Sequence, residues 1–136
     1  MNSRPILGLD IGFKRTGVAV SESGLIAQPL GVLEADMPHM TKVLHGIVAY
    51  VDEYSVGTIV VGLPYTEDGE PTSQSLRVEG VLESLRALLA DRQPPVEIVT
   101  VNEFYSSQEA DEMYPNVERD AAAAAIILQH YLDQIT

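Results

Sequence analysis

The first apolar run of the chain, from Ile6 to Ile11, constrains the fold most, because it is short, almost entirely aliphatic and followed directly by Gly12. Strands that are buried on both faces show this pattern, since a sheet covered on each side has no polar face. One carboxylate, Asp10, is set in the run. A buried charge is costly unless a metal ion, a cation or backbone donors compensate it, so Asp10 is a candidate site residue. An Asp that caps the following turn is an equal alternative.

The remaining apolar patterns predict alternating strands and helices. Period-two or continuous apolar runs bounded by turn residues predict strands over residues 6–11, 16–21, 25–33, 58–63 and 96–101. Spacings of three and four predict helices over residues 40–51, 76–89, 106–113 and about 117–135. Pro29 indicates an edge or a bulge in the third strand.

This order of elements predicts an α/β fold. Three strands without an intervening helix form an antiparallel meander, and the helical crossovers that follow make the last two strands parallel to the first. We therefore expect a five-stranded mixed sheet flanked by helices. A chain of 136 residues has the size of a single domain, which we place at residues 1–136.

The composition favours the cytoplasm. The chain has no cysteine, which excludes disulfides and thiolate metal sites and fits a reducing compartment. No basic segment followed by a long apolar run marks a signal peptide, and no stretch approaches the roughly 20 apolar residues that cross a bilayer. We expect a cytoplasmic protein that does not bind membranes.

The net charge argues against nucleic-acid binding through the overall electrostatic field. The chain has 8 Lys and Arg against 20 Asp and Glu, a formal charge of −12. Binding to a phosphate backbone depends largely on cations and weakens steeply with salt. Nucleic acid would therefore require a local basic patch or bound metal, and the high negative charge can equally be a solubility feature.

Three acids follow or precede elements that are predicted to meet at one edge of the sheet. Asp10 ends the first strand, and Asn102 and Glu103 follow the fifth. Ligand sites of open α/β sheets lie beyond the carboxyl ends of the parallel strands. Asp120 lies one turn before Ala124, on the inward stripe of the last helix. Taken alone, Asp120 is better explained as a first-turn acid that compensates the helix dipole.

Together, the three carboxylates predict a metal site. They would repel one another unless cations neutralised them, and oxygen ligands with open positions suit Mg²⁺ or Mn²⁺. Two such ions about 3.5–4 Å apart activate water and stabilise the leaving oxygen of a phosphodiester. The chain offers no evident serine–histidine nucleophile that would indicate another hydrolytic mechanism.

Three motifs resemble the YqgF/RuvX family. They are GLDIGFKRTGVA at residues 8–19, VGLP at residues 61–64 with Asp68-Gly69, and Asp120 ahead of its alanines and Ile127-Leu128-Gln129. The resemblance spans nearly the whole chain. It implies an RNase H-like fold and a nuclease related to Holliday junction resolvases, acting on structured RNA in processing of the pre-16S rRNA 5′ end or on branched DNA.

The resemblance also implies roles for particular residues. Asp10, Glu103 and Asp120 would be the catalytic acids and would bind Mg²⁺ or Mn²⁺. The substrate-binding residues that it implies are Gly12, Lys14, Arg15 and Arg77.

Two departures from the family pattern remove positive charge. The family's arginine after the glutamate is absent, since Phe104 follows Glu103, and residues 113–119 contain one cation, Arg119. We expect weakened nucleic-acid binding. The alternative function is a catalytically weak or inactive domain that binds a protein partner. A phosphotransferase of the actin type is disfavoured, because it needs two such domains. Monomer and homodimer both remain open.

Overall fold

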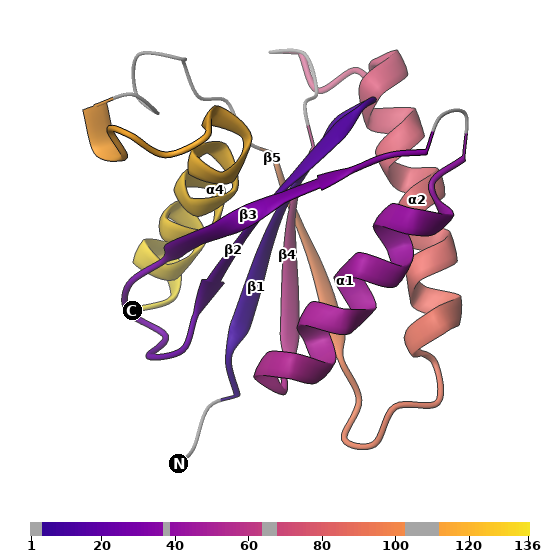
Figure 1. Cartoon of the computed structure of the whole chain (residues 1–136), viewed down its shortest axis with the longest axis horizontal. Helices are drawn as coiled ribbons and strands as arrows, with labels where there is room; N and C mark the ends of the chain where they lie inside the picture. Colours follow the sequence, from indigo (N-terminus) through magenta and orange to yellow (C-terminus); the bar gives the residue numbers. More distant parts are fainter. Residues whose placement is uncertain (1–3, 37–38, 64–67, 103–111) are drawn as a thin grey trace.

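The structure, a computed structural model, describes residues 4–36, 39–63, 68–102 and 112–136. These residues form a five-stranded mixed sheet with the strand order β3-β2-β1-β4-β5. The strands are β1 (Ile6–Ile11), β2 (Arg15–Ser21), β3 (Gln28–Glu34), β4 (Thr58–Leu63) and β5 (Glu97–Asn102). β1, β4 and β5 are parallel, and β2 is antiparallel to both β1 and β3 (Figure 1). The predicted meander with two added parallel strands is confirmed.

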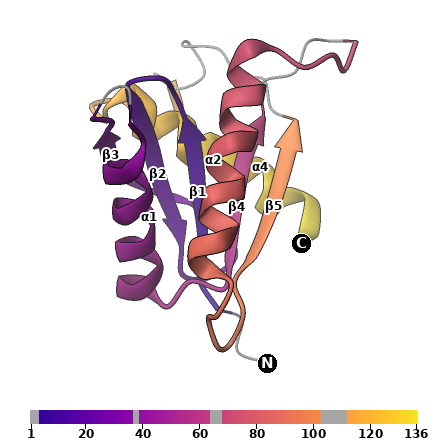
Figure 2. The same ribbon diagram turned by 90° about the vertical axis from the view of Figure 1, so that its right-hand side faces the viewer.

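Helices cover both faces of the sheet. α1 (Thr41–Tyr54) and α2 (Ser73–Leu89) lie on one face, and α4 (Arg119–Ile135) lies on the other (Figures 1 and 2). α4 packs on β1, β2, β3 and β4, so it crosses most of the sheet. The arrangement is a three-layer α/β fold.

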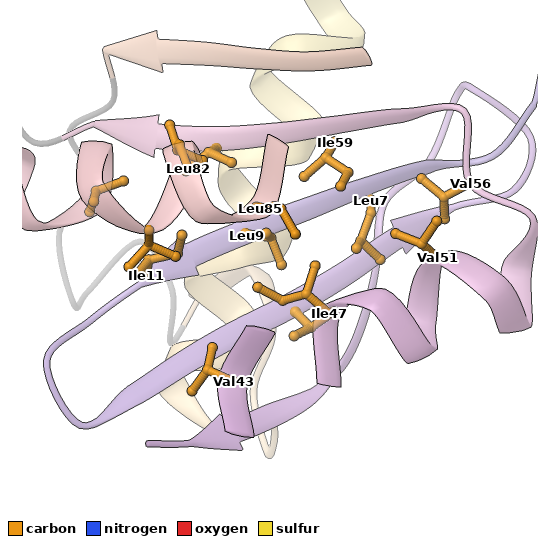
Figure 3. Packing of buried hydrophobic residues seen from close by; sticks show 14 of the residues in the cluster. Leu7, Leu9, Ile11, Val43, Ile47, Val51, Val56, Ile59, Leu82 and Leu85 are labelled. Carbon is orange, nitrogen blue, oxygen red and sulfur yellow. The ribbon is translucent and has the colours of Figure 1, made fainter. Parts of the chain in front are cut away.

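The larger hydrophobic core lies between the sheet and helices α1 and α2. Figure 3 shows Leu7, Leu9 and Ile11 of β1 facing this layer, where they meet side chains such as Ile47 of α1 and Leu85 of α2. Because successive side chains of a strand point to opposite faces, the residues between them on β1 face α4. Ile6, two residues before Gly8 on that face, accordingly belongs to a second hydrophobic cluster, which also contains Leu128 of α4.

The third strand shows the irregularity that its proline predicts. Val18 pairs with Gly31 and Ala19 with Pro29, so the register shifts between these two pairs. β3 is also an edge strand. An edge strand and a bulge both tolerate the missing N–H of proline. The prediction of an edge or bulge at Pro29 is confirmed.

Two helices begin two or three residues away from the position that the apolar spacing indicates. α2 begins at Ser73, because Thr72 and Ser75 form a reciprocal capping box. α4 begins at Arg119, two residues after its predicted start. Most of the predicted helix at residues 106–113 lies outside the described residues. In the part of the chain that the structure describes, no helix has the length and apolar character needed to cross a membrane.

Candidate active site at the carboxyl edge of the sheet

Asp10 lies on the face of the sheet that α4 covers. A Cβ placed on Gly8 would lie 2.7 Å from Cβ of Leu128, so position 8 faces α4. Asp10 follows two residues later on the same strand and therefore shares that face. The side chain is intermediate in burial, at the end of β1. It thus reaches solvent at the carboxyl edge while its strand remains in the core.

Gly17 brings Asp120 to the same place. Gly17 lies directly opposite Asp10 in the antiparallel pair of β1 and β2. A Cβ on Gly17 would lie 1.7 Å from the backbone oxygen of Asp120, so the first turn of α4 rests on the bare backbone of β2. Directly opposite residues have Cβ positions about 5 Å apart. Asp10 and the backbone of Asp120, which are 110 positions apart in sequence, therefore lie close together at this edge.

Arg15 pairs with Asp120 at this point. Its Nε donates to Oδ2 of Asp120 at 2.9 Å. The two side chains are 58% and 33% exposed, so the ion pair is largely in solvent and contributes at most about 1 kcal/mol to stability. Its value is geometric, because it places a guanidinium beside one of the two acids.

The third predicted acid, Glu103, lies outside the described residues. The preceding residue, Asn102, ends β5 and pairs in register with Leu63 of β4. β4 in turn pairs with β1, with Leu9 opposite Val61, so the ends of β1 and β5 lie at a similar height. Within the described part of the chain, no three His, Cys, Asp or Glu side chains gather closely enough to hold a metal ion.

The turn between β1 and β2 is narrow and tied to α2. The N–H of Gly12 donates to the carbonyl oxygen of Arg15 at 3.0 Å. A Cβ on Gly12 would lie 2.6 Å from that same oxygen, so the turn accepts only glycine without adjustment. From α2, Nε2 of Gln74 donates to the carbonyl oxygen of Ile11 at 2.6 Å.

The remaining predicted substrate-binding cations border this turn. Lys14 is exposed at its tip. The guanidinium carbon of Arg77, on α2, lies 4.6 Å from the centroid of the Phe13 ring, and Nη2 lies 3.6 Å from Sδ of Met40. Arg119, the first residue of α4, precedes Asp120. Although the chain carries a net charge of −12, four of its cations thus lie at this turn, on α2 beside it or at the start of α4.

A second group of arginines lies at the opposite end of the sheet and supports the fold there. A cavity of about 360 Å³ is lined in part by Arg4, Asp52 and Arg92. Arg4 donates to the carbonyl oxygens of Val56 and Pro95 at 2.8 and 2.9 Å, and Arg92 pairs with Asp52. The hydrogen bond from Arg92 lowers the pKa of the Asp52 carboxyl. These arginines are already engaged by the protein itself.

Comparison with known proteins identifies the family. The profile of the RuvX family, described as Holliday junction resolvase, matches residues 4–134. A protein of Chloroflexus aggregans named "Putative pre-16S rRNA nuclease" is 37% identical, over 98% of this chain and 96% of the relative. A Gloeothece citriformis protein of the same name is 38% identical, over 94% of this chain and 87% of its own length. The chain belongs to the RuvX family.

A solved structure supports the RuvX assignment at the level of the fold. The RuvC protein of T. thermophilus, in complex with a Holliday junction substrate, matches with a TM-score of 0.66 and 15% identity. The match covers 98% of this chain and 96% of RuvC. The expected RNase H-like architecture of a resolvase-related protein is therefore confirmed.

Three features of this RuvX chain were not apparent from the sequence. They are the Arg15–Asp120 ion pair, the position of Phe13 under Arg77, and the bond from Gln74 to the turn. Arg15 and Asp120 are 105 positions apart, and no local spacing indicates their contact. For Gly17, the sequence did offer a signal, because a glycine inside a strand often marks a close approach by another backbone.

Proposed function

We propose that this chain is an endonuclease that hydrolyses phosphodiester bonds of structured nucleic acid with the help of Mg²⁺ or Mn²⁺. Its relatives at 37% and 38% identity carry the name of a pre-16S rRNA nuclease, so precursor 16S rRNA, cut near its 5′ end, is the first substrate to test. Branched DNA is the second, because the family is described as Holliday junction resolvase.

The observation that carries the proposal is the contact between Gly17 and the backbone of Asp120. This contact sets the backbone of Asp120 near Asp10, the residue paired with Gly17, which supports a shared site for their two carboxylates. Two carboxylates at the carboxyl edge of a parallel sheet form a donor set of hard oxygen atoms, which fits Mg²⁺ or Mn²⁺. Glu103, which follows Asn102 in the sequence, is the third ligand in the proposal.

In the proposal, the three acids bind the metal ion and the basic residues bind the substrate. Asp10, Glu103 and Asp120 would hold the metal. When bound, Mg²⁺ or Mn²⁺ supplies a more acidic water and stabilises charge on the leaving oxygen. Arg15, which lies beside Asp120, would orient the phosphate of the strand to be cut. Lys14 and Arg77 flank the turn and would contact neighbouring phosphates, while Gly12 keeps the backbone of the turn open.

The test is cleavage by Asp10→Asn. This change retains the shape of the side chain and removes the charge, so metal-dependent cleavage should fall below detection while the thermal midpoint stays similar or rises. Cleavage is measured on labelled precursor 16S rRNA and on a four-way DNA junction, with Mg²⁺, with Mn²⁺ and with a chelator. Calorimetric titration with Mn²⁺ reports metal binding independently and should show a loss of affinity.

Asp91→Asn is the matched control. Asp91 is an exposed acid beyond the end of α2, at the other end of the sheet, so the same change there should leave cleavage intact. Equal cleavage by Asp10→Asn and the unaltered chain would exclude the proposed site.

The high negative charge favours one alternative, a domain that binds a protein partner and does not cut nucleic acid. The net charge of −12 weakens attraction to any phosphate backbone. If the unaltered chain leaves both substrates uncut at low salt with either metal, this alternative replaces the nuclease.

A further inference from the structure

Phe13 is an apolar side chain placed at the tip of the turn that carries the proposed site. It is 48% exposed, although the strand residues on both sides of the turn are largely buried. Exposure of an aromatic ring at such a position leaves apolar surface in water, which is unfavourable for the isolated protein. A ligand with a flat apolar face would cover that surface.

Contacts restrain both the Phe13 ring and the turn that carries it. The guanidinium carbon of Arg77 lies 4.6 Å from the ring centroid, so a cation–π contact covers part of the ring. The backbone on either side is restrained as well. Gln74 holds the carbonyl oxygen of Ile11, and the N–H of Gly12 closes the turn onto Arg15. A restrained aromatic ring loses little entropy when a ligand stacks on it.

The surroundings of Phe13 match a nucleic-acid strand. Lys14 and Arg15 follow it directly in the sequence, and both are exposed. Arg15 reaches from there to Asp120, so Phe13 lies two residues from a side chain that contacts one of the proposed catalytic acids. An exposed aromatic ring among cations is the arrangement by which proteins bind single-stranded nucleic acid, with the ring stacking on a base and the cations on phosphates.

We propose that Phe13 stacks on an unpaired nucleobase beside the phosphate that the site binds. The inference rests on the proposed nuclease function and narrows its substrate. The cut strand would have an unpaired or unstacked base next to the scissile phosphate, as in a single-stranded flank, a loop or a junction, and an uninterrupted duplex would be a poor substrate. A stacked base is common to RNA and DNA, so oligonucleotides of both kinds are compared in the test.

The chain contains no tryptophan, so Phe13→Trp provides a single fluorescent reporter at the proposed position. The full chain with this substitution is titrated with three probes of equal length, each made as RNA and as DNA, in the presence of a chelator that prevents cleavage. They are a single strand, the same strand with abasic sites, and a blunt duplex. Binding is followed independently by the anisotropy of a label on each probe.

Leu25→Trp is the matched control. Leu25 is 62% exposed and lies in the connection between β2 and β3, at the opposite end of the sheet from the turn at Phe13. We expect the single strand to quench the indole emission of the Phe13→Trp variant strongly and the abasic strand and duplex to quench it weakly. The emission of the Leu25→Trp variant should stay unchanged with every probe.

Affinity provides the second measurement. Phe13→Ala should weaken binding of the single strand by about 5- to 150-fold, the range found when a stacking aromatic is removed, and should change binding of the abasic strand little. Phe13→Tyr should retain the affinity, and Phe13→Leu, which is apolar but not aromatic, should not.

Three results would overturn the inference. They are an unchanged emission of the Phe13→Trp variant when anisotropy shows the single strand bound, equal quenching by the single and abasic strands, and no binding of the single strand. Cleavage of rRNA or junctions by the unaltered chain is scored separately. If cleavage persists in these cases, the proposed nuclease function is retained and only the stacking role of Phe13 is rejected.

Discussion

The two faces of the sheet are packed in different ways. On the face of α1 and α2, long aliphatic side chains such as Leu9, Ile47 and Leu85 separate the helices from the strands. On the face of α4, two strand glycines lie close to the helix: Gly17 meets the backbone of Asp120, and Gly8 meets Leu128. Residues 121–125 of this helix are all alanine. Long side chains therefore set the distance between helix and sheet on one face, whereas at Gly17 on the other face backbone atoms set it.

This difference separates stability from geometry. A layer of interlocking aliphatic side chains contributes most of the apolar burial but can adjust when one side chain changes. Where the backbone of α4 rests on Gly17, there is no side chain to adjust, and Asp120 is the residue in contact. The face with less apolar volume thus fixes the position of the proposed catalytic acid.

Gly17→Ala tests this difference between the two faces most directly. The added methyl would occupy the position of the Asp120 carbonyl, so α4 must move away from β2. We expect a loss of about 3 kcal/mol or more in the free energy of unfolding, measured in urea, because backbone cannot rotate out of the way. Mn²⁺ affinity should fall as well, since Asp120 moves with the helix.

Gly80→Ala is the control for the same chemical change. Gly80 lies within α2 and has no atom within 4 Å of an added Cβ. The substitution should raise the free energy of unfolding by about 0.5–1 kcal/mol, because alanine loses less conformational entropy in a helix. Equal effects at positions 17 and 80 would contradict the close contact between β2 and α4.

Leu85→Ala tests the opposite face. Leu85 is fully buried in the core under α2, and its truncation should cost about 2–5 kcal/mol of stability. Cleavage and Mn²⁺ affinity per folded molecule should change little at a temperature where the variant remains folded. If cleavage or Mn²⁺ affinity per folded molecule falls together with the free energy of unfolding, the two faces do not contribute separately to stability and to the site.

Arg15→Ala should produce the smallest effect on stability and a selective effect on binding. The ion pair with Asp120 is exposed, so less than about 1 kcal/mol of unfolding free energy should be lost. Nucleic-acid affinity should fall, and the slope of log affinity against log salt should decrease by about one. An unchanged slope would remove Arg15 from the contact surface.

The sequence was sufficient for the fold because its strands carry strong local signals. β1 and β4 match their predicted limits of 6–11 and 58–63, since continuous aliphatic runs end at glycine or proline. The apolar spacing was less reliable for the helices. Leu76 is 58% exposed, because nine residues place it roughly 180° around α2 from the buried Leu85.

For the candidate site, the sequence could indicate the edge of the sheet but not the side-chain contacts at that edge. The strand ends and the inward stripe of α4 predicted that Asp10 and Asp120 would approach each other. In the structure, Asp10 pairs with Gly17, and the backbone of Asp120 rests on that glycine. The contact of Asp120 with Arg15 depends on side-chain conformation at long sequence separation, which no periodic pattern encodes. The apolar spacing was also wrong at the end of α4, where Ile135, the last residue of the predicted helix, is 55% exposed.

The pairing of Asp10 with Gly17 has a consequence for the length of the turn that joins β1 to β2. Surface turns ordinarily accept an inserted or deleted residue with little harm. Here a change of one residue that shifted the pairing would set Asp10 opposite a different neighbour and bring a side chain under α4 in place of Gly17. Although the turn between residues 11 and 15 is open to solvent, its length is therefore as strictly constrained as a position in the core.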